Sequence, residues 1–245
     1  MKKDFACKPT ETVIAGMPAL VSGSGEPLVF LHGFMSSKEA FSSQIAFFSK
    51  RFKTVAVDMK GFGENSPMTY PYTLSDYVRD FYFLADALGG KVNVIAHSFG
   101  CRVALKAAAE SDKINKLVLC GAAGLKTKKS FKFYAKRCVY RLIGGLFEKE
   151  KREKIFFSSD YNMLDDVMKQ SFKYVTAELL DDKLKNVKSP VLAVFGENDD
   201  QTPSYLAKKI KANINGAQTH IMKGCGHFCF AEKPCEFNFA VNEFL

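Results

Sequence analysis

Residues 91–108 read K-V-N-V-I-A-H-S-F-G-C-R-V-A-L-K-A-A and carry the strongest structural signal in the chain. An apolar, β-branched run leads into Ser98, which has the small residues Ala96 and Gly100 two positions away on either side. A nucleophile on a tight turn between a strand and a helix needs such small neighbours, because its backbone is strained. The stretch therefore predicts a strand, a sharp turn that presents Ser98, and a helix that starts directly after it.

Similar apolar runs recur on both sides of this stretch and alternate with longer helical patterns. We expect strands at 28–31, 55–57, 92–96, 117–120, 191–195 and 220–222. We expect helices at about 38–50, 73–88, 99–110, 204–213 and 234–245. Near-continuous apolar runs are typical of strands buried on both faces, and their alternation with helices predicts an α/β fold with a mostly parallel sheet covered on both sides. Thr12 to Ser22, interrupted by Gly16-Met17-Pro18, predicts a hairpin at the sheet edge.

One interval interrupts this alternation. From about Leu125 to Lys188 the sequence shows only helical patterns rich in lysine and aromatic residues, over a length greater than a connection needs. We interpret residues 125–187 as a helical cap above the active edge of the sheet, inserted between the two parts of one core, 1–124 and 188–245. A separate, independently folded helical domain is the alternative.

Two further residues complete a possible catalytic group with Ser98. A serine hydroxyl needs a base within hydrogen-bond reach and a third group to orient that base. His227, in G-C-G-H-F, and Asp199, in G-E-N-D, each follow an expected strand, and the chain order Ser, acid, His suits this type of turn. Both lie at the carboxyl edge of the sheet, where ligands bind in open α/β folds. Asp200 competes with Asp199 for the third role.

The reaction also needs hydrogen-bond donors for a developing oxyanion. His32-Gly33-Phe34 follows the expected strand 28–31, so the backbone N–H groups of Phe34 and Phe99 are the predicted oxyanion hole. The other histidines are weaker candidates for the base: His32 is expected to hold backbone, His97 to point away from the nucleophile, and His220 to lie within a strand.

Composition narrows the classes of partner. The 245 residues are 47% apolar and 25% charged, with a net charge of +9, and a lysine-rich stretch at 126–141 carries much of the excess. We interpret that stretch as a solvated helix face, since no nucleic-acid motif accompanies it. Neither a membrane-length apolar run nor a secretory signal is evident, which predicts a cytoplasmic protein.

Seven cysteines, an odd number at irregular spacing, are expected to be free thiols, several of them buried. Cys225-Gly226-His227-Phe228-Cys229 lacks the paired spacing of a structural zinc site, so no metal is predicted.

Taken together, five motifs resemble the α/β-hydrolase superfamily, specifically its capped single-domain members. The motifs are L-H-G-F at 31–34, D-M-K-G-F-G-E-N-S at 58–66, A-H-S-F-G at 96–100, G-E-N-D-D-Q-T-P at 196–203 and G-C-G-H-F at 224–228. The resemblance implies an eight-stranded sheet with an antiparallel second strand, a cap at about 125–187, no cofactor, and the acid at Asp199. In the 58–66 loop, Asn65 stands where the family pattern has serine.

Within this family the fold does not select the reaction. The leading hypothesis is hydrolysis of a small carboxylic ester, or a related acyl substrate, through an acyl-enzyme. Cleavage of a C–C bond in a meta-cleavage-type vinylogous diketone is the second. A ligand receptor that uses the same pocket is a third, and a basic nucleic-acid-binding protein is the last. Ser98 argues against dehalogenation, which uses an aspartate nucleophile in this family.

Overall fold

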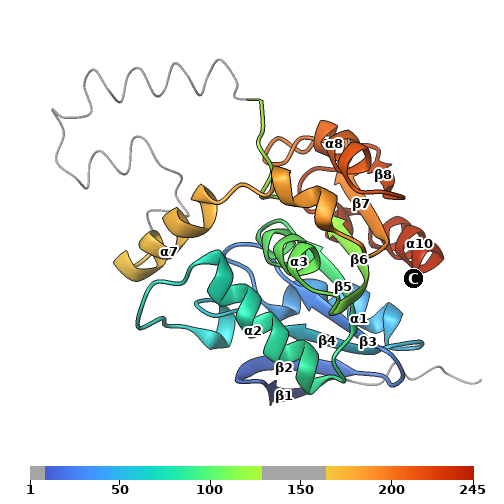
Figure 1. Cartoon of the computed structure of the whole chain (residues 1–245). Coiled ribbons are helices and arrows are strands. Elements are labelled where there is room, and N and C mark those ends of the chain that lie inside the picture. Colours follow the sequence, from blue (N-terminus) through green and yellow to red (C-terminus); the bar gives the residue numbers. More distant parts are fainter. Residues whose placement is uncertain (1–8, 129–163) are drawn as a thin grey trace, which may run out of the picture.

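Strand β5, which precedes Ser98, lies in the interior of an eight-stranded sheet in the computed structural model of the chain (Figure 1). The structure describes residues 9–128 and 164–245. The strands are β1 (Thr10–Ile14), β2 (Met17–Ser22), β3 (Pro27–Leu31), β4 (Lys53–Val57), β5 (Val92–His97), β6 (Ile114–Cys120), β7 (Val191–Gly196) and β8 (Gln218–Met222). Their order across the sheet is β1-β2-β4-β3-β5-β6-β7-β8.

Only β2 runs against the other strands. It pairs antiparallel with β1 on one side and with β4 on the other, whereas β3 to β8 pair in parallel. This confirms the mostly parallel eight-stranded sheet, its antiparallel second strand and the hairpin at its edge. The carboxyl ends of β3 to β8 consequently meet at one edge.

Helices cover the sheet on both faces, as the alternating pattern predicts. On one face lie α2 (Leu74–Ala87), α3 (Phe99–Glu110) and α8 (Tyr205–Asn213), which bury Val78, Val103 and Ile210 against the sheet. On the other face α1 (Ser42–Phe48) and α10 (Pro234–Phe244) bury Ile45 and Phe237. The interior strands β5 and β7 are fully buried, which explains their continuous apolar runs, whereas the edge strands β1 and β8 are mostly exposed or half-buried.

Local signals set several helix boundaries. Thr73 caps α2: its hydroxyl accepts from the Asp76 amide, and the Asp76 carboxylate accepts from the Thr73 amide. The helix expected at 38–50 is instead a 3-10 turn, Lys38–Phe41, followed by the shorter α1. Two short elements without a sequence signal are the 3-10 turn η2 (Gly63–Asn65) and the helix α9 (Cys229–Glu232).

The interval expected to form the cap is described in part. Its described elements are α7 (Asp166–Ala177) and the 3-10 helix η4 (Asp181–Asn186), while residues 129–163, and with them most of the basic stretch 126–141, lie outside the described residues. The cap boundaries at 125 and 187 stay a prediction.

Five cysteines fall in the described ranges, and all five are free thiols, as expected: Cys101, Cys120, Cys225, Cys229 and Cys235. Over the same ranges, the helices lack the combined length and apolar character of a membrane span.

Candidate active site

Ser98 occupies a strained turn between β5 and α3. Its φ of 48° and ψ of −106° place a non-glycine residue in a sparsely populated region of backbone conformation. A Cβ at Gly100 would lie 2.3 Å from the carbonyl oxygen of Leu31, so only glycine fits there. Ala96 is fully buried, which shows that its methyl group is accommodated on the other side of the turn. The residue pattern around Ser98 thus has a steric cause.

Asp199 and His227 are joined at the same edge of the sheet. The Nδ1 atom of His227 lies 2.8 Å from Oδ2 of Asp199, and both side chains are buried. Asp199 follows β7 and His227 follows β8, so two separate loops bring the pair together. With Nδ1 donating to the carboxylate, Nε2 of His227 is left as the basic nitrogen.

The carboxylate of Asp199 accepts further hydrogen bonds. The amides of Gln201 and Thr202 donate to Oδ1 at 2.9 and 2.8 Å, and the Thr202 hydroxyl donates to Oδ2 at 2.7 Å. Burial by itself raises the pKa of Asp199, but the hydrogen bonds from His227 and Thr202 outweigh it and lower the pKa. Asp200 is exposed. No sequence pattern indicated the hydrogen bond from Thr202 to Asp199.

His97 connects the turn at Ser98 with the loop of His227. Its ring is buried, lies 4.8 Å from the His227 ring, and has Nε2 3.1 Å from the His227 carbonyl oxygen. Burial, and next the nearby His227, lower the pKa of His97 to about 3, so the ring is neutral and Nε2–H donates. His97, the residue before Ser98, therefore contacts the loop that carries His227, while no hydrogen bond joins the side chains of Ser98 and His227 within the described residues.

The loop after β3 lies directly beside Ser98. A Cβ at Gly33 would be 2.7 Å from Nδ1 of His97 and 3.6 Å from Cβ of Ser98. Neither the Phe34 nor the Phe99 amide donates a hydrogen bond within the described residues. His32 holds this loop as expected, since Nε2 accepts from the Met59 amide at 3.1 Å and Nδ1 donates to the Gly33 carbonyl at 2.7 Å.

Lys38 and Asp58 form a buried ion pair next to this loop, and no sequence pattern indicated it. Lys38 Nζ lies 2.9 Å from Asp58, 3.0 Å from Glu39 and 3.1 Å from Glu64, and the side chains of Lys38 and Asp58 are 1% and 0% exposed. The pair ties the loop after β3 to the loop after β4. In that second loop, the Asn65 amide side chain donates to the Asp58 carbonyl at 3.0 Å, which gives the residue in the serine position a turn-closing role.

Helix α7 reaches the same region from the other side. The ring of Phe172 lies 4.7 Å from that of Phe34, and the Phe34 ring lies 6.1 Å from that of Phe99. Aromatic rings from α7, from the loop after β3 and from the start of α3 therefore lie close together at this edge of the sheet.

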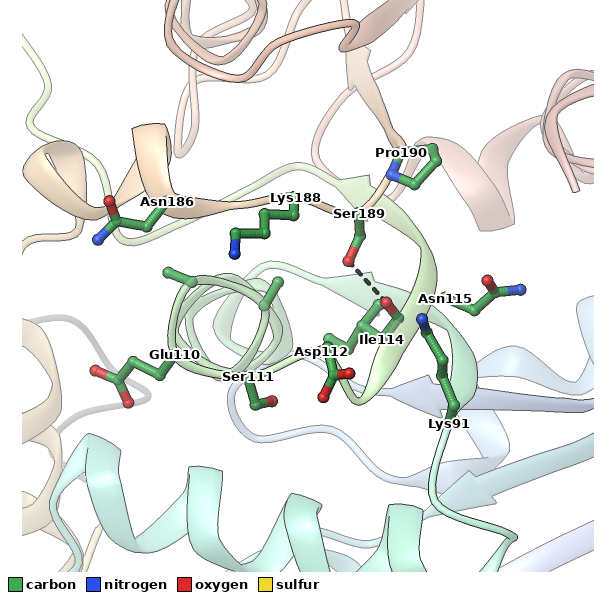
Figure 2. A pocket seen from close by; sticks show the side chains of 12 residues that line it. Lys91, Glu110, Ser111, Asp112, Ile114, Asn115, Asn186, Lys188, Ser189 and Pro190 are labelled. Atoms are coloured by element: carbon green, nitrogen blue, oxygen red, sulfur yellow. Dashed lines mark hydrogen bonds between the residues drawn. The ribbon is translucent and has the colours of Figure 1, made fainter.

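Two cavities lie at the carboxyl edge of the sheet. One, of about 700 Å³, lies between the loop after β3, the loop after β4 and the start of α7. The other, of about 300 Å³, lies beyond β6 and is lined by Arg102 and Thr202 among others. A third, of about 380 Å³, opens at the opposite edge of the sheet, beside Ile114 at the start of β6 and Pro190 before β7 (Figure 2). It lies at the far end of α3 from Ser98 and so does not serve this site.

In the described ranges no three His, Cys, Asp or Glu side chains are grouped to hold a metal ion. The Cys225 to Cys229 segment contributes instead to packing: Cys229 lies with its sulfur 3.4 Å from that of Cys120, and both thiols are buried.

A strained serine after the central strand β5 and an Asp–His pair at the same sheet edge define an α/β enzyme of the hydrolase class. The chain belongs to the alpha/beta hydrolase family, whose profile matches residues 28–240. Among curated proteins, the 2-hydroxy-6-oxo-6-(2'-aminophenyl)hexa-2,4-dienoic acid hydrolase of Metapseudomonas resinovorans is 24% identical over 249 residues, which cover 92% of this chain and 86% of that protein.

Solved structures share the fold. A serine hydrolase involved in carbazole degradation matches with a TM-score of 0.76 at 22% identity and covers 96% of this chain and 98% of its own. A carboxylesterase from Bacillus subtilis matches with a TM-score of 0.73 at 20% identity, over 98% of this chain and 92% of its own.

Proposed function

We propose that the chain is a serine hydrolase that cleaves a small carboxylic ester through an acyl-enzyme. The observation that carries this proposal is the buried 2.8 Å contact between Asp199 and His227 at the sheet edge where the strained turn presents Ser98. A serine, a histidine and an aspartate together form the arrangement that activates an alcohol, and this chemistry supports the proposal.

In the proposed reaction, Ser98 Oγ attacks the ester carbonyl while Nε2 of His227 takes its proton. The amides of Phe34 and Phe99 stabilise the oxyanion, and His227 returns the proton to the leaving alcohol. Water then attacks the acyl-enzyme with His227 again as base, which releases the acid and regenerates Ser98. Asp199 keeps His227 in the tautomer that leaves Nε2 free to accept.

Turnover of p-nitrophenyl acetate and butyrate tests the proposal. We expect hydrolysis by the wild type, loss of activity in Ser98→Ala, and a fluorophosphonate adduct that mass mapping places on Ser98. An unchanged rate in Ser98→Ala, with the adduct elsewhere, would refute the assignment. Tight ligand binding without any turnover would favour a receptor.

Cleavage of a C–C bond is the second candidate, because the dienoic acid hydrolase relative aligns over 92% of this chain. The same three side chains would act on a vinylogous diketone. Rapid turnover of a meta-cleavage product together with slow turnover of the esters would favour this reaction; the reverse order of rates would favour ester hydrolysis.

A further inference from the structure

The cavity of about 300 Å³ beyond β6 is lined by residues that contact the candidate site. Ala123 lines it, and the Ala123 amide donates to the carbonyl of Ser98 at 3.3 Å. Thr202, which donates to Asp199, lines it from the opposite loop. A ligand in this cavity would therefore lie between the nucleophile turn and the loop of the acid.

Arg102 lines this cavity from α3, one helical turn, or about 6 Å, beyond Ser98. Its Nη1 donates to the carbonyls of Val175 and Glu178 at 3.1 and 3.0 Å, at the end of α7. No carboxylate within the described residues accepts a hydrogen bond from Arg102, because the Glu178 carboxylate is bound to Lys106 at 2.7 Å. Nη2 and Nε thus remain as donors of a half-buried cation.

The electrostatics of Arg102 favour an anionic ligand. Burial lowers its pKa, and the nearby Glu178 offsets this only in part. A guanidinium in this state gains more from a carboxylate than a fully hydrated one does, because part of its desolvation has already occurred.

The two cavities at the carboxyl edge of the sheet differ in the charge of their lining residues. The lining of the cavity beyond β6 includes the cations Arg102 and Lys126 and no acidic residue. The larger cavity, beside the loop after β3, is lined by the acids Glu39 and Asp165 and by no cation. A carboxylate-bearing substrate would therefore place its charge beyond β6 and its uncharged part on the other side.

We propose that Arg102 binds a carboxylate on the acyl part of the substrate, so that the substrate class is short half-esters of dicarboxylic acids. The inference rests on the proposed function, since it assigns the acyl side of the same reaction. Charge-assisted hydrogen bonds are among the stronger ones in proteins, and we expect a preference of about 10- to 100-fold in kcat/KM.

The test compares monomethyl glutarate with its neutral isostere, methyl 4-carbamoylbutanoate. We expect the wild type to prefer the charged ester at least about 10-fold, and Arg102→Met to reduce the ratio of the two kcat/KM values toward one. Lys208→Met is the matched control: it removes one exposed cation from α8, outside the cavity lining, and should leave the ratio unchanged. A wild-type ratio near or below one overturns the inference without recourse to any variant.

Binding separates this inference from the proposed function. Calorimetry of the Ser98→Ala protein compares the affinities for glutarate and for glutaramide, and so measures binding at the carboxylate site without turnover. Binding of glutarate that Arg102→Met weakens by about 10-fold or more supports the site even if neither ester is hydrolysed. Equal binding of glutarate and glutaramide rejects it, even if neutral esters are hydrolysed through Ser98.

Discussion

Asp199 and Asp200 are adjacent in the chain, yet the fold gives their carboxylates different surroundings. Asp199 is buried and accepts hydrogen bonds from His227, Gln201 and Thr202, whereas Asp200 faces solvent. The Asp199 carboxylate contacts the imidazole of His227 and accepts hydrogen bonds on both of its oxygens, which suits it to fix the tautomer of that ring. Substituting each of the two aspartates in turn therefore tests which one orients His227.

We expect Asp199→Asn to lower kcat on p-nitrophenyl butyrate by about 10⁴-fold, because an amide at this position favours the wrong tautomer of His227. Asp200→Asn should remain within about twofold of the wild type, since exposed groups without such contacts contribute little. Steady-state kinetics of both variants, with circular dichroism to check folding, make the measurement. A larger loss in Asp200→Asn would reverse the assignment.

At this scale the sequence predicts residues that a motif fixes and misses those that only tertiary contact brings in. Ser98 was predictable because its turn needs small neighbours, and the Asp199–His227 contact because both residues follow parallel strands. Lys38 and Thr202 had no such signal. Each acquires its partner from another loop or from a local turn, and residue type alone does not indicate that geometry.

The loop after β3 is held in place by contacts with two other parts of the chain. The Lys38–Asp58 ion pair links it to the loop after β4. The ring of Phe172, on α7, packs on the ring of Phe34. The position of the Phe34 amide therefore depends on elements that are distant in sequence.

We expect Phe172→Ala to lower kcat/KM on p-nitrophenyl butyrate by about 2- to 10-fold, the worth of an aromatic pair. Tyr174→Ala, on the same helix, is the control: Tyr174 is 46% exposed, and we expect little effect. Equal losses in the two variants would show that α7 acts only through its overall stability and not through the contact with Phe34.

Substitution of Lys38 tests how much the buried Lys38–Asp58 ion pair stabilises the fold. Lys38→Met leaves Asp58 as a buried charge without its main partner, so we expect the free energy of unfolding to fall by about 3 kcal/mol. Lys38→Met combined with Asp58→Asn should lose less, since the asparagine is neutral, although its single amide oxygen can accept from only one of the amides of Lys38 and Glu64, which donate to different oxygens of Asp58. Urea titrations measure both. A double variant less stable than Lys38→Met would contradict the argument.

Over the whole molecule, the order of strands and helices was predictable because both periodicities are strong. Interior parallel strands such as β5 and β7 are buried on two faces, and each major helix has one apolar side. The ends of individual elements were less predictable than their order. Strand β6 begins at Ile114, three residues before the expected start, because exposed Asn115 interrupts the apolar run. The chain also encloses several polar groups at the sheet edge, and their burial links its stability to pH.

His97 makes that link measurable. Its pKa is lowered to about 3 in the folded chain by burial and by His227 and His32, with Asp199 opposing them, whereas an unfolded histidine titrates near 6.5. Between these values the unfolded chain binds the extra proton, so the stabilisation is complete above pH 6.5 and is lost as the pH falls toward 3. The free energy of unfolding falls by at most about 1.4 kcal/mol per pH unit through this group.

The variant His97→Gln keeps a donor for the His227 carbonyl but does not titrate. The pKa of His32 is also lowered by burial, but His32 is present in both proteins. Urea unfolding at several pH values from 6.5 down to 4.5 should therefore give a shallower decline for His97→Gln than for the wild type, whatever their absolute stabilities. Parallel declines would show that His97 takes up its proton in the folded state and that the ring is not held neutral between the two loops.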